Sequence, residues 1–168
     1  MVDIEADGPI PGDYSMVSIG VVLVDGKLDR TFYGQLKPIS DRFEPNHLAV
    51  TGHTREETLG FDDPREVLER LENWLNAESR GRPHFVADNA FDWMFVCWYY
   101  HHFLGRNPFG IGSTNLGSLY KGVVRDMFQN FKHLRKTPHT HHPVDDALGN
   151  AEALMAIKER YNLKIRAN

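Results

Sequence analysis

The order of the predicted strands and helices limits the folds that this chain can adopt. Three β-rich segments come first, at residues 1–6, 14–25 and 31–37, and Asp25-Gly26 is a hairpin signal between the second and the third. Apolar strand and helical patterns then alternate along the rest of the chain. An antiparallel three-strand meander that leads into β–α units predicts an α/β protein. Its mixed sheet would add parallel strands to the meander and be flanked by helices.

The second part of the chain supplies the helices and a buried strand. A helix is predicted to begin at Pro64, after a capping aspartate, because apolar residues recur there at helical spacing. His84–Ala87 is typical of a short buried strand, and Phe91–Leu104 is apolar nearly all round, which indicates a buried helix. We further expect short helical pieces at Glu44–Gly60, a weakly signalled strand at Ser113–Leu116, a helix within Thr114–Phe131, a loop at Lys132–His142 and a last helix from Pro143 to Tyr161.

Length and composition narrow the class of protein. A chain of 168 residues suits one domain, predicted here as residues 1–168. The formal charge of −4 argues against a broad basic surface for long duplex nucleic acid. A single cysteine, Cys97, excludes an internal disulfide and fits a reducing compartment. The longest apolar run, 91–100, is too short to span a bilayer, and acidic residues stand where a secretory signal would be positive. We therefore expect a cytoplasmic protein with no membrane partner.

Acidic residues from separate segments form the candidate site. Asp3 and Glu5 are two apart, so on a strand both side chains point to the same face. Asp92 follows the buried strand, where α/β sheets place their ligands. Asp146 lies one turn into the last helix, and His141 lies on the loop before it. Carboxylates suit hard cations such as Mg²⁺ and Mn²⁺, and a histidine suits proton transfer near neutral pH.

Three motifs in this order resemble those of the DEDDh 3′→5′ exonucleases. This DnaQ-like family includes proofreading subunits of DNA polymerases, RNase T and oligoribonuclease. The motifs are Asp3-Ile-Glu5, Asn89-Ala-Phe-Asp92 and His141-x-x-x-x-Asp146, and the likeness extends to Tyr33–Pro38, Ala49–His53 and Val144–Ala147. It covers most of the chain. Asp88 stands where many members have histidine, which we interpret as a change in the surrounding contacts rather than loss of the site.

The resemblance implies an RNase H-like sheet and a set of functional residues. It implies two Mg²⁺ or Mn²⁺ ions with His141 as general base, and the ligands would be Asp3, Glu5, Asp92 and Asp146. Contacts to the 3′-terminal nucleotide would come from Ala6, Asp7, Gly8, His53, Asn89 and Phe91. In the third motif His142 and Asp145 are alternatives, and the family spacing selects His141 and Asp146. Because several relatives pair, a homodimer is also expected.

The resemblance therefore implies a metal-dependent 3′→5′ exonuclease that releases nucleoside 5′-monophosphates from single-stranded nucleic acid. RNA is slightly favoured over DNA, because the chain is small and acidic and has no appended domain. An RNase H-like endonuclease would share the sheet and the carboxylates. A non-catalytic nucleic-acid-binding or polymerase-associated module is the alternative from another class.

Two further groups of residues allow more than one interpretation. His139, His141 and His142 could form a zinc cluster, but no cysteine is near and the many carboxylates favour Mg²⁺ or Mn²⁺. The basic residues before them could contact phosphates or simply form an exposed loop. These basic residues are Lys132, Arg135 and Lys136.

Overall fold

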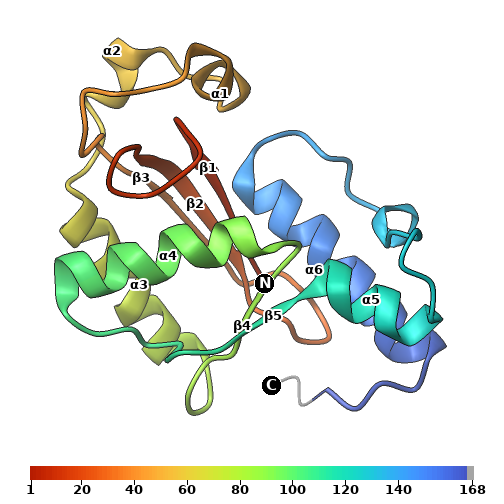
Figure 1. Ribbon diagram of the computed structural model, residues 1–168. Coiled ribbons are helices and arrows are strands. Elements are labelled where there is room, and N and C mark those ends of the chain that lie inside the picture. The colour runs from red at the N-terminus through yellow and green to blue at the C-terminus, as the bar shows by residue number, and fades with distance from the viewer. Residues whose placement is uncertain (166–168) are drawn as a thin grey trace.

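Three strands within the first 35 residues form the predicted antiparallel meander. The structure is a computed structural model that describes residues 1–165, so the last three residues of the predicted domain lie outside it. Strands β1 (Val2–Ala6), β2 (Met16–Val22) and β3 (Thr31–Gln35) pair in the order β1-β2-β3 (Figure 1). In β1, Asp3 and Glu5 alternate with three buried residues, which confirms that both acids share one face.

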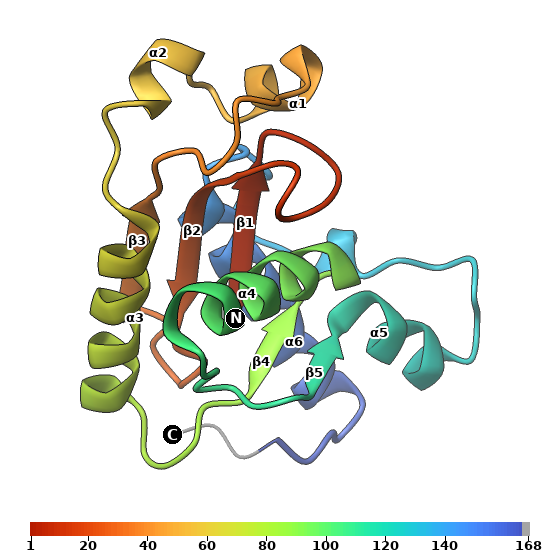
Figure 2. The same ribbon diagram turned by 60° about the vertical axis from the view of Figure 1, so that its left-hand side comes forward.

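Two parallel strands extend this arrangement. β4 (Phe85–Ala87) and β5 (Ser113–Asn115) form a two-stranded parallel ladder of their own, and β4 lies beside β1 (Figure 2). Helix α4 (Ala90–Leu104) connects them as a crossover. The Asn89 side chain caps α4 by accepting from the Phe91 amide, and Gly105 ends it in the left-handed conformation. The weakly signalled strand near Ser113 is therefore confirmed as β5.

Helices cover both faces of the meander. Helices α3 (Pro64–Glu78) and α4 pack on one face, where the buried residues of β1 join their core, and α6 (Pro143–Arg160) packs on the other (Figure 2). Asp3 and Glu5 consequently face α6. The remaining helices are α1 (Pro45–Val50), α2 (Arg55–Thr58), α5 (Leu116–Val124) and a 3₁₀ turn at Lys132–Leu134. Among the described residues, none of the helices has the length and apolar character needed to cross a membrane.

The helix predicted within Thr114–Phe131 is confirmed as α5, which occupies the middle of this range. Thr114 and Asn115 belong to β5, and α5 ends at Val124 because Arg125 takes the left-handed conformation with φ of 57°. The apolar residues that follow do not reach the core, since Met127 is 72% exposed and Phe128 is 98% exposed. A longer helix would thus have no apolar face to bury there.

Gly20 sets how closely α6 approaches the meander. A Cβ atom at this position would lie 2.3 Å from the carbonyl carbon of Pro143 and 2.4 Å from the nitrogen of Val144. Gly20 is also the residue of β2 that pairs with Asp3 of β1. The missing side chain therefore allows the first turn of α6, which carries Asp146, to lie directly beside the strand that carries Asp3.

Candidate active site

Four carboxylates from three elements converge at the end of β1. Ligand oxygens of Asp3, Glu5 and Asp146 all lie within 4.8 Å of one another. Asp92, in the first turn of α4, lies close to them: its Oδ1 accepts a hydrogen bond of 3.2 Å from the Ile4 amide, between Asp3 and Glu5, and its charge raises the pKa of Asp3. The fold thus brings the four predicted acids together, although they are separated by more than half of the chain.

Burial and mutual repulsion raise the pKa values of three of these acids, Asp3, Glu5 and Asp92. Burial raises the pKa of Asp3 well above its usual value, and Asp92, Asp146 and Glu5 raise it further. The pKa of Glu5 rises to about 8, first through burial and then through Asp146 and Asp92. The pKa of Asp92 rises to about 7 through burial and the nearby Asp88. A bound cation would relieve this repulsion.

The donor set fits a divalent cation. The Oδ2 atom of Asp92 is buried and has no hydrogen-bond partner, which is a costly arrangement for a carboxylate oxygen unless it coordinates an ion. The other candidate ligands, Asp3, Glu5 and Asp146, also offer carboxylate oxygens. Such an all-oxygen set suits Mg²⁺ or Mn²⁺.

Asp146 is held in place by the segment that precedes α6. Its Oδ1 accepts from Arg135 Nη2 at 3.1 Å and from the Thr140 amide at 3.2 Å, and its Oδ2 accepts from the His141 amide at 3.0 Å. The Arg135 side chain is only 7% exposed, so the expectation of an exposed or phosphate-binding side chain is wrong for this residue. A Cβ at Gly149 would lie 2.5 Å from Arg135 Nε. In the sequence, only the presence of a glycine inside the predicted last helix could have indicated that Arg135 packs so closely on it.

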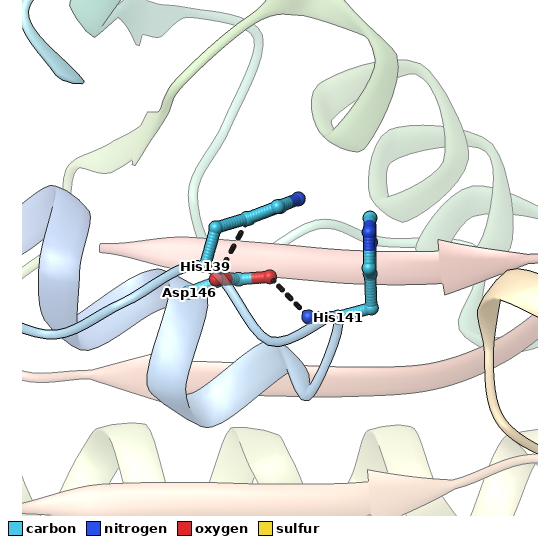
Figure 3. A group of neighbouring side chains, drawn as sticks. All are labelled: His139, His141 and Asp146. Carbon is cyan, nitrogen blue, oxygen red and sulfur yellow. Dashed lines mark hydrogen bonds and ion pairs between the residues drawn. The ribbon is translucent and has the colours of Figure 1, made fainter.

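His141 lies at the edge of the carboxylate cluster. Its side chain is 47% exposed, and its Nδ1 is 3.8 Å from Glu5 Oε1. The residue has φ of 61°, a conformation that is uncommon outside glycine and often occurs at functional sites. His139 lies beside it, with Nδ1 2.8 Å from Asp146 Oδ1 (Figure 3). The loop therefore presents two histidines to the same carboxylate.

The alternatives in the third motif lie elsewhere. The ring of His142 packs against the ring of Tyr33 at a centroid distance of 4.8 Å. Asp145 accepts a hydrogen bond of 3.1 Å from Thr140 Oγ1, within the loop. The geometry thus favours His141 and Asp146, as the spacing did.

Asp7 has a structural setting that the sequence did not indicate. Its side chain is fully buried, where it accepts from Arg55 Nη1 at 2.9 Å and from the Ser15 amide at 2.5 Å. This salt bridge ties α2 to the end of β1. The neighbouring Gly8 lies against the ring of Tyr14, where a Cβ would overlap ring atoms. The Asp7 side chain is therefore held inside the fold by Arg55 and the Ser15 amide, and its contact with a substrate stays a prediction.

The other predicted substrate contacts differ in how deeply they are buried. Ala6 is buried in the core, and Asn89 is exposed while capping α4. His53 is half-buried between Phe61 and Gln35, whose Nε2 is 3.1 Å from His53 Nε2. Phe91 is partly buried and packs against Phe95. Their role in substrate binding remains a prediction.

The chain is similar to several known nucleases, although no family model matches it. The 3′-5′ DNA exonuclease Cap18 of Escherichia coli is 42% identical over 127 residues, which are 73% of this chain and 67% of Cap18. The nuclease domain of 3′hExo, a DEDDh family member solved with rAMP, is similar with a TM-score of 0.79 and 19% identity, covering 98% of this chain and 94% of that domain. Cell-death related nuclease 4 (CRN-4) is similar with a TM-score of 0.76 and 18% identity. That match covers 95% of this chain but only 62% of the length of CRN-4.

The fold matches that of the 3′hExo nuclease domain, which confirms the predicted RNase H-like fold class, and the similarity to Cap18 identifies the chain as a nuclease. The identity to Cap18 then gives the family: the chain belongs to the DEDDh 3′→5′ exonucleases. The resemblance drawn from the three motifs is therefore confirmed.

Proposed function

We propose that this chain removes nucleoside 5′-monophosphates from the 3′ end of single-stranded nucleic acid, using two Mg²⁺ or Mn²⁺ ions. The observation that carries this proposal is the convergence of Asp3, Glu5, Asp92 and Asp146, where burial and mutual repulsion raise the pKa values of the first three. Two relatives support it: Cap18 is a 3′-5′ DNA exonuclease, and the 3′hExo nuclease domain was solved with rAMP, a nucleoside monophosphate.

The carboxylates and the histidine of the site would have different roles in hydrolysis. Asp3, Glu5, Asp92 and Asp146 would hold the cations, which when bound offset the negative charge of the phosphodiester and of the leaving oxygen. His141 would take a proton from the attacking water, because its Nδ1 faces the carboxylates while the ring stays open to solvent. Its amide donates to Asp146 Oδ2, so the base and a cation ligand keep a fixed relation.

One assay on matched substrates would show whether the protein prefers RNA or DNA. Composition slightly favours RNA, whereas Cap18 is a DNA exonuclease. The purified protein with Mn²⁺ is incubated with 5′-end-labelled RNA and DNA oligomers of one sequence, single- and double-stranded. We expect single strands to shorten progressively from the 3′ end. The ratio of the RNA and DNA rates then gives the preference.

Two variants test the residues in the same assay. His141→Ala should lower the rate by about 10²- to 10⁴-fold, the usual contribution of a general base, and Asp3→Asn should abolish hydrolysis. His142→Ala, one position away and packed on Tyr33, is the matched control. Full activity in either His141→Ala or Asp3→Asn would overturn the assignment.

The homodimer also remains a proposal. The outward face of α4 carries Trp93, Met94 and Trp98, and Met94 is 37% exposed. Light scattering on the purified chain would show a mass twice that of one chain if this face pairs, and Trp98→Glu should then return it to a single chain.

A further inference from the structure

A second group of possible metal ligands shares Asp146 but differs in chemistry. It consists of His139, His141 and Asp146, whose ligand atoms all lie within 4.8 Å of one another. The centroids of the two imidazole rings are 4.2 Å apart, and both side chains extend from the same loop toward the same side of it (Figure 3). Their side chains are 48% and 47% exposed, so an ion in solution can reach them.

We propose that His139, His141 and Asp146 bind Zn²⁺ or a similar nitrogen-preferring transition-metal ion. Two imidazoles and one carboxylate, with a fourth position left to water, form a ligand set that zinc accepts. Imidazole ligands favour zinc over magnesium, whereas the Asp3, Glu5 and Asp146 set offers oxygen alone. The site is thus separate in its selectivity from the proposed catalytic metal site.

The residues of this site differ by one from the zinc cluster that the sequence allowed, which was His139, His141 and His142. His142 lies on Tyr33 and is replaced by Asp146, which comes from the first turn of α6. A mixed histidine and carboxylate set is open on one side, unlike a four-ligand structural zinc site. It therefore suits an ion that binds from solution rather than one that holds the fold together.

The hydrogen bonds of Asp146 leave room for such an ion. Its Oδ1 already faces Arg135, Thr140 and His139, but its Oδ2 accepts only from the His141 amide. The second oxygen therefore keeps a lone pair for a metal. Arg135 Nη1 is 3.5 Å from His139 Nδ1, and this nearby positive charge weakens the binding of a cation. We consequently expect reversible zinc binding rather than a permanent structural ion.

Zinc at this position would affect the reaction. It would occupy His141, the proposed base, and Asp146, a proposed ligand of the catalytic ions. Zn²⁺ is therefore expected to inhibit the hydrolysis that Mn²⁺ supports. This consequence rests on the proposed function, but the binding itself does not.

Binding is tested without activity, by calorimetric titration of EDTA-treated protein with Zn²⁺ and separately with Mn²⁺. His139→Ala should lower the Zn²⁺ affinity by at least about tenfold, since even indirect metal partners contribute that much, and leave Mn²⁺ affinity close to wild type. Asp3→Asn should do the reverse. His142→Ala is the matched control and should change neither. Co²⁺ used in place of Zn²⁺ should show visible absorption bands that His139→Ala removes.

Several results would overturn this proposal. One is equal Zn²⁺ affinity in the wild type and in His139→Ala. Another is a loss of Zn²⁺ affinity in Asp3→Asn as large as in His139→Ala, because zinc would then occupy the oxygen site. Circular dichroism checks that each variant is folded, and His139→Asn serves as a second variant. A protein that binds zinc as expected but does not hydrolyse nucleic acid would contradict the proposed function and leave the zinc site intact.

Discussion

Replacing Gly20 with alanine should misplace the active site without touching any of its side chains. The new Cβ would lie 2.3 Å from the Pro143 carbonyl carbon, whereas ordinary contacts begin at 3.4 Å, so α6 would have to retreat by about 1 Å. Because Gly20 pairs with Asp3 and the first turn of α6 carries Asp146, this shift separates two of the clustered acids. A displacement of about 1 Å can lower kcat by about 100-fold. Overpacking should also destabilise the protein by about 1–3 kcal/mol.

The assay compares Gly20→Ala with a matched glycine variant. The rate at saturating Mn²⁺ is measured on a single-stranded oligomer, and thermal unfolding is followed separately. Gly122→Ala in α5 is the control, because a Cβ there would meet nothing within 4 Å and alanine favours the helix by up to about 1 kcal/mol. A Gly20→Ala protein with the wild-type kcat and unfolding temperature would refute the reasoning. A lower unfolding temperature with unchanged kcat would show that the close approach serves packing alone.

Three other predictions concern charge and packing around the site. In metal-free protein the pKa of Glu5 is about 8 and that of Asp92 about 7, so the folded state binds more protons than the unfolded state. Protonated Glu5 and Asp92 contribute stability that is fully present below about pH 4 and is lost as the pH rises through 7 to 8. The unfolding temperature in EDTA should therefore fall from about pH 5 to pH 9. Mn²⁺ should restore it. A rise over this range would contradict the assignment. Arg55→Met leaves the buried Asp7 without its partner and should cost about 3–5 kcal/mol in denaturant unfolding, which an unchanged midpoint would disprove. Gly149→Ala should displace Arg135 from the buried Asp146 and lower the stability in denaturant unfolding by about 3–5 kcal/mol despite its gain in helix propensity, and an unchanged midpoint would show that Arg135 tolerates the extra methyl group.

Much of the site could be predicted because its signals are local. Alternation in β1 places Asp3 and Glu5 on one face whatever the rest of the chain does. The proline at position 143 fixes where α6 begins, and hence that Asp146 lies in its first turn. The order of the three meander strands follows from the order of the β-rich segments and the hairpin signal between the second and the third. These features require no knowledge of distant contacts, and the structure confirms them.

The remaining features depend on contacts between distant residues. Arg55 reaches Asp7 across 48 positions of the sequence, and no local pattern indicates which arginine is buried. The sequence around Arg135 likewise indicates only a basic loop, and its burial against Asp146 depends on the packing of α6 beside that loop. The end of α5 rests on the left-handed conformation of Arg125, which the identity of an arginine does not indicate. Such features are set by tertiary packing.

The most direct measurement compares a linear single strand with the same strand closed into a circle. Both are incubated with the protein and Mn²⁺, and released nucleoside 5′-monophosphates are quantified by mass spectrometry. We predict stepwise loss of the linear strand from its 3′ end, with the circle left intact. Cleavage of the circle would indicate an endonuclease. Binding of Mn²⁺ and nucleic acid without any hydrolysis would indicate a non-catalytic module, and either result would contradict the exonuclease assigned to this site.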